Sequence, residues 1–192
     1  MKNMSKRVFV IVLTLGIIAS TATSLLAAPK KVKPEEELIA LLTSAKDKDV
    51  INALQELEKN YPTSAKSLAA IKPLLTDNRR PVVRKAARVL GAVNAEVSEA
   101  DLKNIAALLK GAEKYEIIDG LKALRGLKAA STIPEITLLL KHPDKNVVRD
   151  ACRTLAVLGD KSLVPTIKPL LEVPDLAVQK DAADAIAILK EK

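Results

Sequence analysis

The chain of 192 residues offers one histidine, His142, and one cysteine, Cys152, for acid–base, redox or metal chemistry. A metal cluster needs several such groups that converge in space, and an intramolecular disulfide needs two cysteines. The sequence also shows no glycine-rich phosphate loop, no Ser/His/Asp set and no paired carboxylates spaced for catalysis. We therefore expect no catalytic residue, no metal or cofactor site, and no enzymatic activity.

Both residues have ordinary structural explanations. His142 lies in the segment Lys-His-Pro-Asp at 141–144, whose proline and aspartate are typical of a solvated turn. Cys152 occupies a column of the repeat described below in which the other residues are apolar, which predicts a small buried side chain. The other members of that column are Leu54, Ala87, Leu121 and Ala183.

Leucine doublets recur along the chain and define an internal repeat. The doublets are Leu41–Leu42, Leu74–Leu75, Leu108–Leu109, Leu139–Leu140 and Leu170–Leu171. Eleven residues after each doublet stands a small residue, namely Ala53, Ala86, Gly120, Ala151 and Ala182. Four residues further stands a large aliphatic one, namely Leu57, Leu90, Leu124, Leu155 and Ile186. Successive doublets are 33, 34, 31 and 31 residues apart, so the length varies in only one part of the repeat.

This spacing predicts two short amphipathic helices per repeat, an A helix that carries the small residue and a B helix that ends in the doublet. The predicted ranges are 35–43 (B), then 46–76, 79–110, 114–141 and 145–172 (each A followed by B), and 176–190 (A). Asp144 and Asp175 precede predicted helices as N-caps, and Pro81 suits a first helical turn. Such helices bury their apolar faces only by stacking, so we expect an all-α superhelix (solenoid) of four helix pairs plus a half repeat at each end.

The composition agrees with closely packed aliphatic helices and limits the partner classes. Hydrophobic residues make up 48% of the chain and aromatic residues only 2%, so the core must consist of Leu, Ile, Val and Ala. The formal net charge is +8, with acidic and basic residues interspersed. This excess is too diffuse for the dense basic stripe typical of a nucleic-acid-binding protein.

Residues 1–28 have the pattern of an export signal. Lys2, Lys6 and Arg7 precede the apolar run 8–18, and a stretch of small residues follows. The pattern predicts a cleaved signal peptide, a linker at 29–34 and a repeat domain at 35–192, in a periplasmic or secreted protein. An uncleaved inner-membrane anchor stays open, because residues 8–28 are just long enough to cross a bilayer.

Two segments carry a resemblance to a known family. Val147–Pro165 and Pro81–Gly91 resemble HEAT-like repeats of the phycobilin-lyase (PBS-lyase) type, and the similarity extends over Asp47–Leu189. The first and third units depart from the pattern, because Ile51 and Ile118 stand where the other units have arginine. The resemblance implies an α-solenoid that serves as a binding surface, with the B helices on its concave side, and it says little about activity.

The resemblance also assigns roles to charged residues. Arg84 and Arg149 follow Val-Val pairs, near Asp77 and Asp144 of the preceding turns, and resemble the Asp/Arg sets that link successive repeats. Charged residues beside the small residue of each A helix predict a solvated outer face with charge ladders. The B helices carry lysines on the side away from the core, and we predict that this weakly basic face contacts an acidic or polar partner. These lysines are Lys72, Lys103, Lys110, Lys141 and Lys168.

The predicted function is therefore an exported, non-catalytic HEAT-repeat scaffold that binds another protein. One alternative is a phycobilin lyase-like or chaperone-type protein, as the repeat type implies. A second is a nucleic-acid-binding HEAT solenoid, which the lack of aromatic residues for base stacking disfavours. Self-association through the terminal segments Glu35–Thr43 and Leu176–Lys190 also stays open. The sequence does not identify the partner.

Overall fold

The computed structural model describes Val32–Lys192, which forms one compact unit. The predicted signal segment 1–28 and the first residues of the predicted linker lie outside the described residues and stay predictions. Within Val32–Lys192, none of the helices combines the length and the apolar character needed to span a membrane.

The described residues form ten α-helices joined by turns and short 3₁₀ segments, and they contain no β-strand. The α-helices are α1 (Glu35–Leu41), α2 (Asp47–Asn60), α3 (Ala65–Ile71), α4 (Arg80–Ala92), α5 (Glu99–Ala106), α6 (Lys114–Gly126), α7 (Ile133–Leu138), α8 (Lys145–Leu158), α9 (Val164–Ile167) and α10 (Leu176–Lys190). The 3₁₀ segments are Lys72–Thr76, Ala107–Lys110, Ala130–Thr132, Leu139–Lys141, Lys161–Leu163 and Lys168–Glu172. Even-numbered helices are the predicted A helices, and odd-numbered helices with the 3₁₀ turns that follow them are the predicted B helices.

The residues predicted to begin helices do so. The Asp144 side chain accepts a hydrogen bond from the backbone N–H of Asn146 at the start of α8, at 2.8 Å. Asp175 accepts two backbone N–H groups at the start of α10, at 2.9 and 3.1 Å. Pro81 lies in the first turn of α4, where its missing N–H leaves no helical acceptor unpaired. Local capping therefore fixes where these A helices begin.

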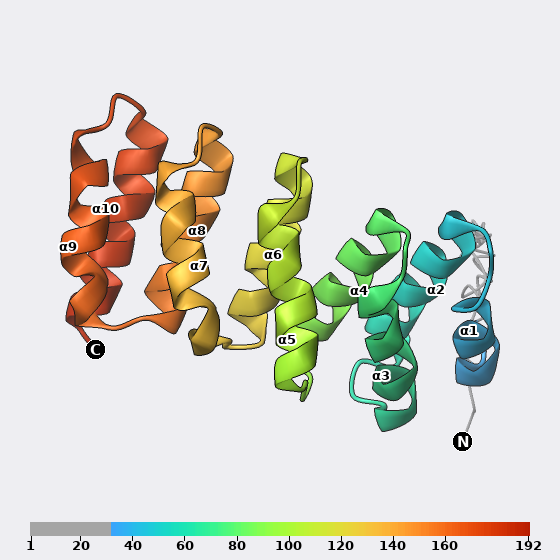
Figure 1. Ribbon diagram of the computed structural model, residues 1–192. Helices are drawn as coiled ribbons and strands as arrows, with labels where there is room; N and C mark the ends of the chain where they lie inside the picture. Colours follow the sequence, from blue (N-terminus) through green and yellow to red (C-terminus); the bar gives the residue numbers. More distant parts are fainter. Residues whose placement is uncertain (1–31) are drawn as a thin grey trace, which may run out of the picture. The chain divides into compact units, whose positions relative to one another are not determined.

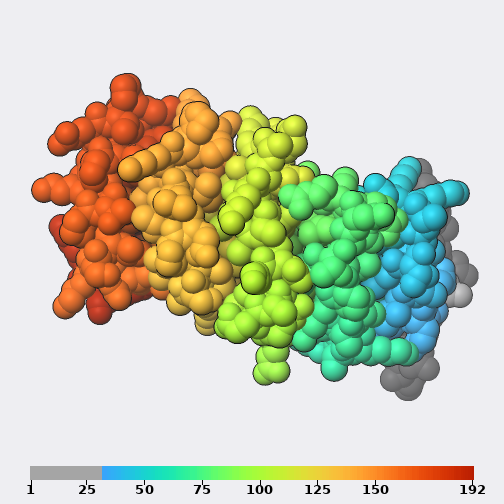
Figure 2. Space-filling view, viewed as in Figure 1, coloured from blue at the N-terminus to red at the C-terminus, as the bar shows by residue number. Residues whose placement is uncertain are grey.

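The helices lie side by side in chain order, from α1 and α2 at one end of the unit to α9 and α10 at the other (Figure 1). Each B helix packs mainly against the A helix that follows it, and each A helix also packs against the A helices before and after it. The terminal helices α1 and α10 are thus each part of a packed pair. The space-filling view shows the same succession as bands of colour that meet only their neighbours (Figure 2). This arrangement is an α-helical repeat solenoid.

The doublets pack against the small residue of the next A helix, as the spacing predicts. A Cβ atom added to Gly120 would lie 3.0 Å from Cβ of Leu108 and 3.3 Å from Cδ2 of Leu109. The second leucine of the first four doublets is buried, and together these units form one continuous aliphatic core. Only the last doublet departs, because Leu171 is 37% exposed where its counterparts are at most 7% exposed.

Helices α4 and α6 approach each other more closely than a side chain would allow. A Cβ atom on Gly91 would lie 2.6 Å from Cα and 2.7 Å from the carbonyl oxygen of Ala123. A Cβ atom on Gly126 would lie 2.7 Å from the carbonyl carbon of Gly91. Glycine at both positions therefore permits contact between the two backbones.

Candidate functional site

Arginines of α4 are paired with carboxylates of α6. Arg84 donates from Nε and Nη2 to Oδ2 of Asp119 at 2.9 and 2.7 Å, and Arg88 donates from Nη1 to Oδ1 at 3.0 Å. One turn before Asp119, Glu116 accepts hydrogen bonds from Nε and Nη2 of Arg80 at 3.1 and 2.8 Å. The Arg80 guanidinium holds the pKa of the Glu116 carboxyl below its usual value. These arginines therefore form ion pairs that join two neighbouring repeats.

The same arrangement recurs between α8 and α10. Arg149 donates from Nε to Oδ2 of Asp181 at 2.6 Å, and Arg153 donates from Nε and Nη2 to Oδ1 at 3.1 and 3.0 Å. The Asp181 side chain is only 8% exposed. One carboxylate thus binds two arginines of the preceding A helix in both places, which gives the solenoid a ladder of ion pairs along its A helices.

The linking role predicted for Arg84 and Arg149 is confirmed, but the predicted partners are wrong. Asp77 is paired instead with Arg79, which donates to it from Nη2 at 2.7 Å and from Nε at 2.9 Å. Asp144 caps α8, and its hydrogen bond from the helix backbone lowers the pKa of its carboxyl. Asp144 also pairs with Nζ of Lys114 in the preceding A helix at 3.5 Å, so neither aspartate binds the predicted arginine, and both arginines reach forward to the next A helix.

The five predicted B-helix lysines lie on successive repeats along the B helices. Lys103 lies within α5, while the others stand at the start or end of the 3₁₀ turns that follow the B helices: Lys72, Lys110, Lys141 and Lys168. Four are exposed and Lys72 is partly buried. Among the described residues, none of the five forms an ion pair with a carboxylate, in contrast to the arginines of α4 and α8. The same helices carry exposed acids at Glu99, Glu135 and Glu172, so the surface is weakly basic.

An exposed apolar column accompanies these lysines and was missed by the sequence reasoning. The residue immediately before each leucine doublet is small or apolar and exposed in all five repeats: Ala40, Pro73, Ala107, Leu138 and Pro169. Leu138 is the largest of them and is 75% exposed. The sequence feature that could have identified this column is its fixed position, one residue before each leucine doublet. An aliphatic side chain held in water beside lysines is suited to contact a partner.

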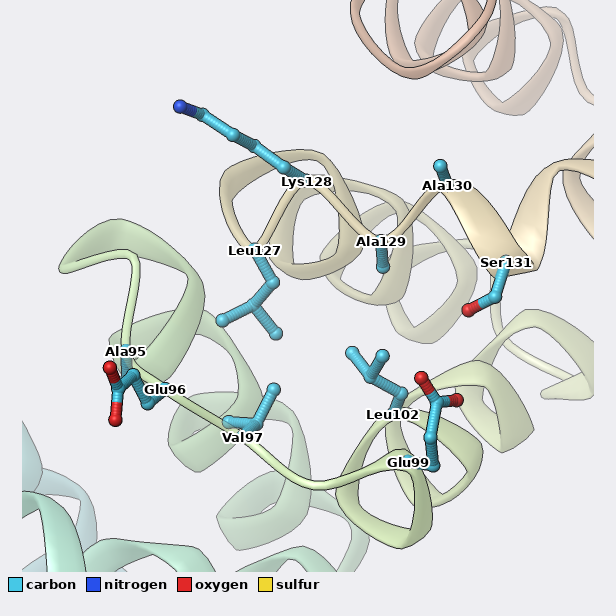
Figure 3. A pocket seen from close by; sticks show the side chains of 10 residues that line it. All are labelled: Ala95, Glu96, Val97, Glu99, Leu102, Leu127, Lys128, Ala129, Ala130 and Ser131. Atoms are coloured by element: carbon cyan, nitrogen blue, oxygen red, sulfur yellow. The ribbon is translucent and has the colours of Figure 1, made fainter.

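A hollow of about 570 Å³ lies between the turn after α4 and the turn after α6. Figure 3 shows the side chains of Val97, Leu102 and Leu127 directed toward its middle, with the carboxylate of Glu99 beside them. The backbone around the hollow includes a left-handed turn at Lys128, with φ of 54°. The lining combines these apolar side chains with charged and polar residues, namely Glu96, Glu99, Lys128 and Ser131.

The structure agrees with the structural explanation of His142. Its Nδ1 accepts a hydrogen bond from the backbone N–H of Asp144 at 3.0 Å, within the turn between two repeats. Within Val32–Lys192, no three His, Cys, Asp or Glu side chains are placed together so that they could hold a metal ion. His142 therefore has a local role in shaping the turn.

Cys152 lies on α8 as a buried side chain with 0% exposure, as its column predicts. Burial raises the pKa of the thiol to about 12, and the nearby carboxylate of Asp181 adds to this effect. The nucleophilic thiolate is therefore scarce in the folded protein near neutral pH.

We expect Cys152 to react with a thiol reagent such as Ellman's reagent only when the protein unfolds. At mildly alkaline pH, labelling of the folded protein should be slower than labelling in denaturant by about a hundredfold or more, because both burial and protonation protect the sulfur. The colour released over time in each condition measures this. Rapid labelling of the folded protein would contradict the burial.

Comparison with known proteins supports the architecture. The family of HEAT repeats matches residues 133–192. Among solved structures, the complex of CpcE and CpcF of phycocyanin lyase from Nostoc sp. PCC7120 is similar at 22% identity with a TM-score of 0.72, over 88% of this chain and 70% of that chain. The described residues therefore form an α-helical repeat solenoid, and its last part, residues 133–192, matches HEAT repeats.

Engineered repeat proteins are similar to the solenoid as well. One engineered protein matches at 22% identity and a TM-score of 0.62, over 81% of this chain and 78% of its own. A designed armadillo repeat protein matches at 19% identity and a TM-score of 0.55, over 80% of this chain and 81% of its own. None of the curated proteins compared with this sequence matches it significantly. At these identities the similarities show the fold alone.

Proposed function

We propose that this solenoid is a non-catalytic scaffold that binds a protein partner through its B-helix surface. The surface consists of the five lysines and the apolar column defined above, with Leu138 as its largest exposed apolar side chain. The observation that carries the proposal is the contrast in charge pairing. The arginines of α4 and α8 are held by carboxylates of the next repeat, whereas the B-helix lysines are free to bind a carboxylate from outside.

This surface fits an extended acidic segment that also carries aliphatic side chains. A repeat solenoid presents equivalent positions at regular intervals, so one segment can meet several lysines in turn. Because each exposed lysine contributes little alone, affinity should depend on several contacts and on the apolar column. The shortage of aromatic residues and arginine on this surface favours modest affinity.

We also propose that the protein acts outside the cytoplasm, in the periplasm or as a secreted protein. The support is the order of residues 1–28, with basic residues, an apolar run and small residues in succession. An inner-membrane anchor is the alternative. The mass of the protein recovered from the cell envelope distinguishes the two, because cleavage removes the first segment.

The test is affinity capture from the envelope fraction of the source cell, comparing the unmodified protein with two double variants. Lys72→Glu/Lys168→Glu reverses two charges in the same Ile-Lys-Pro-Leu-Leu context of the B helices. Lys48→Glu/Lys59→Glu reverses two exposed charges of α2 as a matched control. We expect the first variant to lose at least about tenfold of the captured partner, since like charges now oppose it, and the control to retain it.

Two outcomes would contradict the proposal. Equal capture by both variants would exclude the B-helix lysines, and binding that falls steeply with salt and goes to nucleic acid would favour the nucleic-acid alternative. A second candidate function, a phycobilin lyase-like protein, is favoured by the similarity to the phycocyanin lyase complex. Capture of a bilin-carrying protein would support that candidate, although the buried Cys152 is poorly placed for bilin transfer.

A further inference from the structure

The last helix, α10, leaves an apolar face uncovered by the described residues. Leu176 at its start is 77% exposed, and Leu171 just before it is 37% exposed. The counterparts of Leu171 in the preceding doublets are at most 7% exposed. The start of α10 therefore exposes a leucine where α6 and α8 carry Lys114 and Lys145.

Comparison with α8 shows which face of α10 is involved. Cys152 and Ala156 of α8 are 0% and 2% exposed in the repeat to which α10 is added. Their counterparts in α10 are Ala183 and Ala187, which are both exposed. The small apolar residues kept here indicate that another helix packs against this face.

The charged residues on this face of one copy can pair with the same residues of a second copy. Lys180 and Asp184 lie one turn apart and pair with each other at 2.8 Å, with 76% and 58% of their side chains exposed. If two α10 helices meet antiparallel about a two-fold axis at the level of residue 182, Lys180 of each copy lies opposite Asp184 of the other. The same register places Leu176 opposite Ile188, a rim residue that is 46% exposed. A symmetric dimer requires this kind of self-complementary patch.

A head-to-tail stack of copies would form fewer favourable charge contacts than the two-fold arrangement. Its contact would place α10 against α2, and α2 carries Asn52 where α6 and α10 carry the arginine-binding Asp119 and Asp181. At that position Lys180 and Asp184 would meet the uncharged amide of Asn52. The two-fold arrangement satisfies both charges in each copy.

We propose that the outer face of α10 binds a second copy of this chain and forms a two-fold symmetric dimer. The alanines at 183 and 187 allow the helices to approach closely, and the leucine at 176 adds apolar area at each end. A face of 15 residues is about 22 Å long at 1.5 Å per residue, so the interface is small. The dimer should accordingly be weak and depend on protein concentration.

The test is sedimentation equilibrium of the whole protein as isolated, over a concentration series. The unmodified protein should pass from monomer to dimer as concentration rises. Lys180→Asp should weaken association by about tenfold or more, because two acids of each copy then face two of the other. The double variant Lys180→Asp/Asp184→Lys restores the opposite charges and should restore the dimer.

Two further variants separate the interface from general effects. Ala183→Arg should abolish the dimer, because a long charged side chain would occupy the place where the two α10 helices come closest. Val157→Arg changes a residue of α8 that is 47% exposed and should leave the dimer intact. A monomer at every concentration would overturn the proposal, and so would a dimer insensitive to the changes at 180 and 183. The B-helix lysines take no part, so failure here leaves the scaffold proposal untouched.

Discussion

Replacing Gly126 with alanine is expected to destabilise the protein by roughly 2 kcal/mol, although alanine usually stabilises a helix by about 1 kcal/mol relative to glycine. The methyl group would point into the backbone of Gly91 on α4, with its carbon 2.7 Å from the carbonyl carbon. A backbone atom cannot rotate aside as a side chain can, so α4 and α6 must separate. Gly91→Ala meets the backbone of Ala123 and should have a similar effect.

Gly120→Ala is the matched control on the same helix. Its added Cβ atom would meet side-chain atoms of Leu108 and Leu109 at 3.0 and 3.3 Å, and the other repeats carry alanine at this position. We expect its free energy of unfolding to change by less than about 1 kcal/mol. Urea denaturation followed by circular dichroism measures all three variants. A Gly126→Ala protein as stable as the unmodified one would show that α4 and α6 do not touch in this way.

The glycine contact shows what the repeat pattern could and could not predict. The column of small residues was visible because it recurs at a fixed distance from each leucine doublet, and Gly120 lies in it. Gly91 and Gly126 recur at no such distance, because they serve a single contact between α4 and α6. Their role depends on how two particular helices cross, which is a property of the tertiary packing that hydrophobic periodicity does not contain.

The ion pairs between repeats were also predictable only in part. That Arg84 and Arg149 link repeats could be predicted from the resemblance, but their partners could not. Nearness in sequence suggested Asp77 and Asp144, whereas capping and a local arginine occupy those carboxylates. The true partners are about one repeat further along the chain and became evident only when the A helices were placed side by side.

The candidate binding surface was predicted in part. The lysines were found because two of them recur in identical contexts, and the structure places them on successive B helices. Leu138 was overlooked because a third leucine next to a leucine doublet suggests another buried core residue. The 3₁₀ turn after each B helix fixes which of three adjacent apolar residues faces outward, and the sequence pattern alone does not set that turn.

Asp181→Asn is expected to lower the free energy of unfolding by roughly 2 kcal/mol. The amide keeps the shape of the carboxylate but removes the charge that two arginines share, and its NH₂ group faces a guanidinium donor. Loss of a fully buried ion-pair partner usually costs about 3–5 kcal/mol. The expected value is smaller because the Arg149 and Arg153 side chains are 29% and 46% exposed, so water partly replaces the lost acceptor.

Glu36→Gln is the control for this loss of charge. Glu36 also joins two helices, since it binds Lys66 at 2.7 Å, but both side chains are more than half exposed. Its removal should leave the free energy of unfolding almost unchanged, and added salt should erase any remaining difference. The Asp181→Asn effect should persist in salt, because the carboxylate is screened by protein. Equal, salt-sensitive effects at both positions would mean that the ladder along the A helices is a surface feature that does not hold the repeats together.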